Sequence, residues 1–119
     1  NGSHQFSTGF VQNTIQVTGG DGAFCHIDQD EPQYQFTAYV YNDFYRSNNG
    51  GATWTNVTTS GGDFISPTDY DDVNNKMYVC NTANNYKVWT NPQTGGTFTT
   101  VAVAGFGGTV SAIKVSPNT

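Results

Sequence analysis

Short apolar runs recur along this chain, and clusters of glycine, asparagine, aspartate and proline separate them. No window shows a sustained apolar period of 3.6 residues, so the pattern indicates no amphipathic helix. Short runs bounded by turn-forming residues are typical of β-strands joined by tight connections. The hydrophobic pattern therefore predicts an all-β fold.

The runs fall into two similar units of four predicted strands each. The strands of the first unit are expected near residues 23–27, 35–40, 43–47 and 53–58. Those of the second unit are expected near residues 63–66, 76–81, 86–90 and 97–103. A further strand is expected near 110–115, and the segments 28–32 and 67–75 are expected to be loops.

The chain repeats itself with a period in the forties. Trp54 and Phe98 are 44 residues apart, and so are Tyr45 and Trp89. A period of this length with four short strands per unit is typical of β-propeller blades. We therefore expect four-stranded antiparallel sheets arranged as an incomplete propeller of about two and a half blades. The expected parts are the outer strands of a preceding blade in 1–18, blades in 19–59 and 60–104, and the first strand of a third blade in 105–119.

A closed propeller has at least about four blades of roughly 40–50 residues, more than this chain supplies. We therefore expect the 119 residues to be a piece of a larger protein. The alternative is assembly in trans, in which residues 1–18 of one copy complete the half-blade at 110–119 of another.

Composition agrees with strands and argues against two classes of partner. The chain has no leucine and 14 glycines, and charged residues make up 11% of it with a net charge of −5. Its four cations form no basic patch, which argues against nucleic acid and anionic membrane as partners; they are Arg46, Lys76, Lys87 and Lys114. No apolar run approaches ~18 residues, so we expect no membrane-spanning segment.

The most distinctive motif comprises Ser47, Asn49, Gly51, Thr53 and Trp54. It resembles the Asp-box or BNR repeat, Ser/Thr-x-Asp-x-Gly-x-Thr-Trp/Phe, with asparagine in place of the aspartate. The glycines accept the positive φ of a tight turn, and the short polar side chains can bond the amides of the turn. We interpret these residues as structural. A degenerate second copy spans residues 90–98, with Gln93 in the acidic position.

Three runs, residues 19–28, 45–54 and 110–117, are similar to the large secreted Asp-box propellers common in Bacteroidota. That group includes sortilin-type and xyloglucanase-type propellers, and many of its members carry a sorting domain for type IX secretion. The resemblance implies a secreted or cell-surface protein, exported as secretion cargo. It does not fix an activity, because such propellers host enzymes, adhesins and receptors alike.

Three residues are candidates for binding a ligand: Asp21, Tyr41 and Asp43. Asp21 lies in a glycine-rich loop before the first strand of a blade, where loops line one end of a propeller channel. Tyr41 lies beside the Asn42–Asp43 turn and could stack on a sugar ring. The competing interpretations are a tight turn for Asp21 and core packing for the tyrosine.

No metal site or cofactor is expected. Asp28-x-Asp30 and Asp69-x-Asp71-Asp72 offer oxygen ligands for calcium, but both lack the glycine and terminal glutamate of an EF-hand loop. Solvated turn carboxylates are the favoured interpretation. Cys25 and Cys80 are interpreted as buried thiols, with a disulfide between them as the alternative.

Catalysis is not favoured within these residues. Arg46 is the only arginine, whereas a sialidase needs an arginine cluster. A glycosidase needs two carboxyl groups across a cleft, and Asp21 and Asp63 occupy equivalent turns of successive units. We expect a non-catalytic recognition or scaffold module that binds glycan or protein. The alternative is a piece of a polysaccharide-degrading glycoside hydrolase whose catalytic acids lie partly elsewhere.

Overall fold

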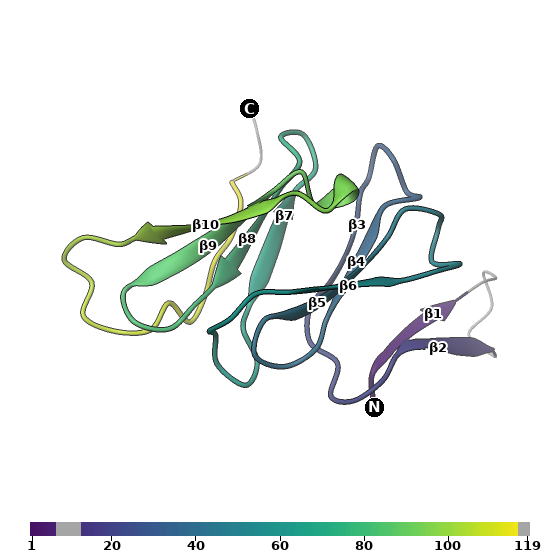
Figure 1. Cartoon of the computed structure of the whole chain (residues 1–119), viewed down its shortest axis with the longest axis horizontal. Helices are drawn as coiled ribbons and strands as arrows, with labels where there is room; N and C mark the ends of the chain where they lie inside the picture. Colours follow the sequence, from purple (N-terminus) through teal and green to yellow (C-terminus); the bar gives the residue numbers. More distant parts are fainter. Residues whose placement is uncertain (7–12, 117–119) are drawn as a thin grey trace.

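The computed structural model confirms the all-β fold. It describes residues 1–6 and 13–116, and within them three antiparallel sheets of two, four and four strands and one short 3₁₀ helix (Figure 1). No closed propeller is present among these residues. Every sheet is a meander, because strands that follow one another in sequence are neighbours in the sheet.

The first sheet contains β3 (Cys25–Ile27), β4 (Gln35–Ala38), β5 (Asp43–Ser47) and β6 (Thr55–Thr58). The second contains β7 (Thr68–Asp71), β8 (Lys76–Cys80), β9 (Asn85–Thr90) and β10 (Thr97–Ala102). The 3₁₀ helix η1 (Pro92–Thr94) lies between β9 and β10. The remaining sheet is the hairpin of β1 (Ser3–Phe6) and β2 (Thr14–Thr18).

The strand predicted at 63–66 is wrong, because the strand lies in the segment 67–75 that was expected to be a loop. Phe64 and Ile65 are exposed, at 50% and 39%. The polar residues Thr68–Asp71 form β7 instead. Tyr70 supplies the apolar contact of this strand, with its ring 5.1 Å from that of Phe36.

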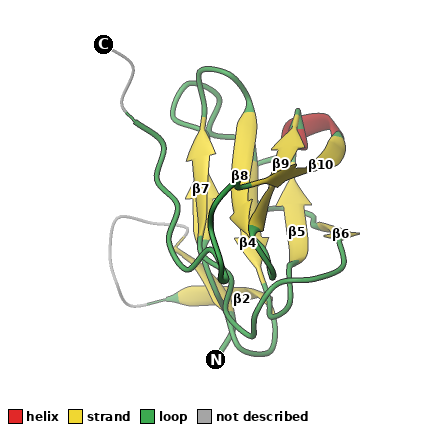
Figure 2. Ribbon diagram, turned by 90° about the vertical axis from the view of Figure 1, so that its left-hand side faces the viewer, coloured by secondary structure: helices red, strands yellow, loops and turns green. Residues whose placement is uncertain are grey.

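The strand predicted at 110–115 is also wrong. These residues run as irregular chain over the outer face of the second sheet (Figure 2). The carboxylate of Asp69 holds them, accepting from the backbone N–H of Val115 at 2.7 Å and pairing with Lys114 at 3.0 Å. Among the described residues, no strand lies beside this segment to complete a backbone ladder.

The core lies between the two four-stranded sheets. Phe36 and Phe44 of the first sheet face Trp89 of the second, with ring centroids 5.9 and 5.6 Å apart. Trp89 is fully buried, and Met77 packs in the same cluster. Burial of each such side chain contributes about 1.5–3 kcal/mol, so this contact between the sheets is the main source of stability.

The two four-stranded sheets have matching registers. Ala38 pairs with Phe44 across one hairpin, and Cys80 pairs with Tyr86 across the other. Phe44 and Tyr86 are therefore equivalent, and by the same register so are Phe36 and Tyr78.

The spacing of equivalent residues is 43 between β3 and β7, 42 between β4 and β8 and between β5 and β9, and 44 between β6 and β10. The alignment of Trp54 with Phe98 agrees with this register, but the alignment of Tyr45 with Trp89 does not. Ser47 pairs with Gln35 and Trp89 pairs with Met77, so Trp89 occupies the place of Ser47.

Candidate functional site

Four connections lie at the same edge of the sheets, because alternate connections of an antiparallel meander share one edge. We call this the loop edge; it comprises residues 19–24, 39–42, 59–67 and 81–84 (Figure 1). The turns at 48–54 and 91–96 lie at the opposite edge. The loop edge includes Asp21 and Tyr41, and Asp43 begins β5 beside it.

A strained turn presents Tyr41 to solvent. Tyr41 and Asn42 have φ values of 55° and 60°, and the N–H of Asp43 donates to the carbonyl of Val40 at 3.2 Å. Two successive positive φ values define a type I′ turn, in which tyrosine is uncommon. The side chain of Tyr41 is 56% exposed, and its ring meets that of Phe64 edge-on at 5.7 Å. The turn therefore holds an exposed pair of aromatic rings.

Asn42 fixes this turn to the second sheet. Its side chain is 1% exposed, and its Nδ2 donates to the carbonyl of Cys80 at 3.2 Å. Its own carbonyl accepts from the N–H of Thr59 at 3.3 Å. Gly62, with φ of 90°, lies so close that a Cβ there would come within 2.5 Å of Asn42 Nδ2. Asn42 thus joins the Tyr41 turn to the loop that carries Phe64.

A buried lysine supports the same loop from below. Lys87 in β9 is 6% exposed, and its ammonium donates to Thr59 Oγ1 at 2.7 Å and to the carbonyl of Ser60. Burial lowers the pKa of Lys87 because the charged form loses hydration. This lysine is used in holding residues 59 and 60, so it offers no free positive charge at the loop edge.

The structure does not bring all three candidate ligand residues together. Asp43 accepts hydrogen bonds from Asn56 Nδ2 at 2.7 Å and Thr58 Oγ1 at 2.5 Å, so its carboxylate is engaged within the sheet. Asp21 is exposed, and within the described residues it makes no hydrogen bond to Tyr41 or Asp43. Phe64 is the partner of Tyr41 that the sequence did not indicate, since it was assigned to a strand.

The Ser47–Trp54 turn has the internal hydrogen bonds expected of a structural motif. Ser47 Oγ accepts from the N–H of Gly51 at 2.9 Å and donates to Asn49 Oδ1 at 2.9 Å. Asn49 Oδ1 also accepts from the N–H of Thr53 at 2.9 Å, while Asn49 Nδ2 donates to Thr53 Oγ1 at 2.8 Å. The indole N–H of Trp54 donates to the carbonyl of Gly51 at 3.0 Å.

Asp28 is the centre of a polar cluster between the sheets. Its Oδ1 accepts from the N–H groups of Asp30 and Glu31 at 3.1 and 2.8 Å. Its Oδ2 accepts from the hydroxyl of Tyr70 at 2.8 Å and from Gln93 Nε2 at 3.4 Å. Burial and the adjacent Asp28 carboxylate raise the pKa of Tyr70 far above its usual value. Protein donors thus occupy both oxygens of Asp28.

His26 connects the two sheets beside this cluster. Its Nε2 lies 2.7 Å from Thr68 Oγ1. Burial lowers the pKa of His26, and the nearby Lys114 lowers it further, whereas Asp69 opposes the shift. The ring is therefore favoured in its neutral form.

The two cysteines have different environments. Cys80 is buried, as expected, whereas Cys25 is exposed, so the prediction of two buried thiols is wrong for Cys25. Both thiols are free, and Cys25 Sγ lies 3.4 Å from Ser3 Oγ.

Among the described residues, no group of three or more His, Cys, Asp or Glu side chains is placed to hold a metal ion. Residues 1–6 and 13–116 also contain no helix with the length and apolar character needed to cross a membrane.

Comparison with known proteins gave no assignment. No protein-family model, no curated protein and no solved structure matched this chain.

Proposed function

We propose that this chain is part of a secreted or cell-surface β-propeller and acts as a non-catalytic recognition module for a glycan or protein ligand. Its two four-stranded sheets are interpreted as successive blades. The matched registers and the shared 42- to 44-residue spacing support this interpretation. The sheets that complete the propeller are proposed as its structural partners, and the resemblance to secreted Asp-box propellers supports export by type IX secretion.

The observation that carries the recognition role is the Tyr41–Phe64 pair. Both rings are at least half exposed, at 56% and 50%, and they lie nearly perpendicular at 82°. Exposed aromatic rings offer apolar area at a low entropic cost, and a tyrosine adds a hydroxyl that can bond a ligand. Asn42 holds the turn rigidly from below, so little ordering is needed on binding.

The carboxylates do not favour catalysis. Protein donors engage Asp28 and Asp43, whereas a glycosidase needs two carboxyl groups facing each other across a cleft. Asp21 remains exposed in its glycine-rich loop. These features favour recognition over the alternative of a polysaccharide-degrading enzyme.

A glycan array combined with a β-glucan hydrolysis assay tests the proposal. Tyr41→Asn removes the ring and keeps a residue that tolerates positive φ. We expect it to weaken ligand binding at least tenfold, which corresponds to a loss of about 1.4 kcal/mol of binding free energy. Val73→Ala is the matched control, because Val73 is 65% exposed but lies in the β7–β8 connection at the opposite edge.

Two outcomes would contradict the recognition role. One is equal binding by the wild type and Tyr41→Asn. The other is turnover of β-glucan that Asp21→Asn abolishes, which would establish the enzyme instead.

A further inference from the structure

We propose that the ligand recognised at the loop edge is a positively charged protein segment, whose arginine or lysine side chain stacks on Tyr41 and pairs with Asp63. This inference rests on the recognition role proposed for Tyr41 and Phe64, and it names the chemical class of the ligand. It assigns that ligand to proteins and not to glycans.

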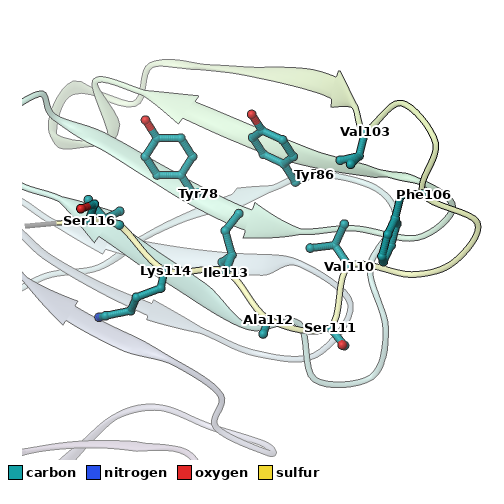
Figure 3. Close-up of a pocket in the computed structure, with 11 residues that line it drawn as sticks. Tyr78, Tyr86, Val103, Phe106, Val110, Ser111, Ala112, Ile113, Lys114 and Ser116 are labelled. Carbon is teal, nitrogen blue, oxygen red and sulfur yellow. The ribbon is translucent and has the colours of Figure 1, made fainter.

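The loop edge stays open to solvent in a stack of sheets. A depression of about 590 Å³ on the outer face of the second sheet is lined in part by Tyr78 and Tyr86 (Figure 3). These tyrosines are the register equivalents of Phe36 and Phe44, so a further sheet of the stack is the expected cover of that face. The loop edge lies instead at the ends of the strands, where stacked sheets do not cover it. Its aromatic pair is therefore free for a ligand.

The charged side chains of the loop edge are all acidic. Its four segments contain the carboxylates of Asp21 and Asp63, both exposed, and no lysine, arginine or histidine. In the first sheet, the order β3-β4-β5-β6 places the Tyr41 turn between the segment that carries Asp21 and the start of the segment that carries Asp63. Negative charge therefore lies on both sides of the Tyr41 turn.

Two observations place the Asp63 carboxylate near the aromatic pair. Asp63 precedes Phe64, whose ring lies 5.7 Å from that of Tyr41. Burial raises the pKa of the Cys80 thiol, and the negative charge of Asp63 raises it further. The carbonyl of Cys80 is the group that accepts from Asn42 beneath the Tyr41 turn. Within the described residues, no side-chain cation pairs with the Asp63 carboxylate, so it is available to a ligand.

Buried amide groups beneath the loops also favour a cation. The Nδ2 atoms of Asn42 and Asn81 donate within the protein. Their Oδ1 atoms are buried and have no hydrogen-bond partner among the described residues. Gly62 packs against Asn42, and Gly61 packs against Asn81 Oδ1, so both amides lie under the loop that carries Asp63. These oxygens do not contact a ligand, but their dipoles add negative potential beneath it.

The positive side chains of the protein leave this potential uncompensated. Lys87 is the one that reaches the loop, where its buried ammonium bonds residues 59 and 60, and two exposed carboxylates outnumber it. Arg46 bonds the carbonyl of a residue in η1, and Lys76 begins β8, both at the opposite edge. Lys114 pairs with an aspartate of β7 at 3.0 Å, and Figure 3 shows its ammonium directed away from the groove.

A guanidinium or ammonium group fits these features together. It presents several N–H donors and no acceptor, and a carboxylate binds it through a charge-assisted hydrogen bond. The face of a tyrosine ring attracts the same cation. A neutral sugar would stack on the ring without depending on the charge of Asp63, and an acidic sugar would be repelled. Dependence on ligand charge therefore distinguishes the classes.

Binding of matched peptides to the 119-residue chain tests the inference. Three blocked peptides share a glycine–serine background and carry several arginines, as many neutral citrullines, or as many glutamates. We expect the arginine peptide to bind at least about fivefold more tightly than the citrulline peptide, and the glutamate peptide to bind least. Higher ionic strength should narrow the difference, because salt screens exposed charges. NMR titration of the isotope-labelled protein gives the affinities and shows which residues shift.

Two charge variants localise the effect. Asp63→Asn should weaken binding of the arginine peptide about threefold and leave binding of the citrulline peptide unchanged. Asp30→Asn is the matched control, because Asp30 is also exposed but lies in the β3–β4 connection at the opposite edge. Equal affinity for the arginine and citrulline peptides, no binding of the arginine peptide, or equal losses in the two variants would overturn the inference. Circular dichroism confirms that each variant retains the wild-type fold.

A neutral β-glucan oligosaccharide separates this inference from the recognition role on which it rests. Suppose that Tyr41→Asn abolishes oligosaccharide binding, that Asp63→Asn leaves it unchanged, and that no peptide shows a preference for arginine. That result would overturn the cationic ligand and keep recognition at Tyr41. Binding of the arginine peptide that is unchanged in Tyr41→Asn would contradict both proposals.

Discussion

The turns at 48–54 and 91–96, at the edge opposite Tyr41, are both closed by an indole hydrogen bond, but the tryptophan that donates it comes from a different position in each. In both, an indole N–H donates to the carbonyl of an equivalent glycine, Gly51 in the first turn and Gly95 in the second. In the first turn the donor is Trp54, at the end of the turn, and its Nε1 lies 3.0 Å from the carbonyl oxygen. In the second turn the donor is Trp89, which precedes the turn, and the distance is 2.8 Å. The position equivalent to Trp54 is occupied by Phe98, which stacks on Trp89 at 4.9 Å.

The two turns differ in whether their side chains bond within the turn or outside it. The first turn is held by its own side chains, Ser47, Asn49 and Thr53. In the second turn, Gln93 Nε2 reaches out of the turn to Tyr70 at 3.0 Å and to Asn75 Oδ1. Hydrogen bonds from Gln93 to residues outside the turn thus stand in place of the side-chain hydrogen bonds among Ser47, Asn49 and Thr53. Stability of the second turn should therefore depend on the whole molecule.

The largest expected effect separates the two tryptophans. Trp89→Ala should reduce the free energy of unfolding by about 3–5 kcal/mol, because it leaves a cavity in the core beside Phe36 and Phe44. Trp54→Ala, at a partly exposed position, should cost clearly less. Urea unfolding followed by tyrosine fluorescence and circular dichroism measures both changes. Equal decreases in the free energy of unfolding for the two variants would contradict the expected difference between Trp89 and Trp54.

The next effect tests whether the second turn depends on the polar cluster. Tyr70→Phe removes the hydroxyl that donates to Asp28 Oδ2 and accepts from Gln93. The loss of a buried hydrogen bond to a carboxylate should cost about 1.5–3 kcal/mol. Urea unfolding gives the value, and amide hydrogen exchange should show faster opening at residues 91–96 than at 48–54. Uniform exchange at the two turns would contradict the coupling.

Acid should affect the junction between the sheets, whereas the side chains that hold the Ser47–Trp54 turn carry no ionisable group. His26 has a pKa below its unfolded value of 6.5, so the unfolded chain binds the proton more readily. The contribution of His26 to the free energy of unfolding is therefore complete above pH 6.5 and is lost as the pH falls toward the folded pKa of His26. Over this range the free energy of unfolding decreases by at most about 1.4 kcal/mol per pH unit. Thermal unfolding of wild type and His26→Gln across this range should show the slope only in the wild type. Parallel profiles would exclude His26 as its source.

The smallest effect concerns the asparagine that replaces aspartate. Asn49→Ala removes acceptors for Ser47 and Thr53 and should cost about 1 kcal/mol. Asn49→Asp keeps the acceptor oxygens, and the Thr53 hydroxyl can reverse its hydrogen bond, so we expect a change within about 0.5 kcal/mol. Urea unfolding of the two variants provides the comparison. A loss as large for aspartate as for alanine would show that the amide donor to Thr53 is essential.

The sequence predicted the strands wherever apolar residues and turn formers alternate in short runs. β4, β5, β8, β9 and β10 lie within a few residues of their predicted places. β7 was missed because its polar residues resemble a loop, and its one large apolar contact, Tyr70 on Phe36, comes from the neighbouring sheet. The segment 110–115 has the composition of a strand, but a ladder needs a partner as well as a sequence.

The candidate site was predictable only in part. The turn signal at Asn42–Asp43 correctly placed Tyr41 at a hairpin end, where its ring is exposed. The engagement of Asp43 by Asn56 and Thr58 depends on the pairing of β5 with β6, and the contact of Tyr41 with Phe64 depends on the packing of two separate loops. Neither follows from local pattern, because both are contacts between distant parts of the chain.

The two thiols differ enough in exposure to measure how often the structure around Cys80 opens. Cys25 is exposed and should react with an alkylating reagent in the native state, whereas Cys80 is 2% exposed and lies where Asn42 joins the sheets. Burial also raises the pKa of Cys80, which lowers its thiolate fraction further. The first thiol thus calibrates the reagent, and the second records how often the second sheet opens around Cys80. Mass spectrometry could follow both in a single unlabelled sample without any substitution.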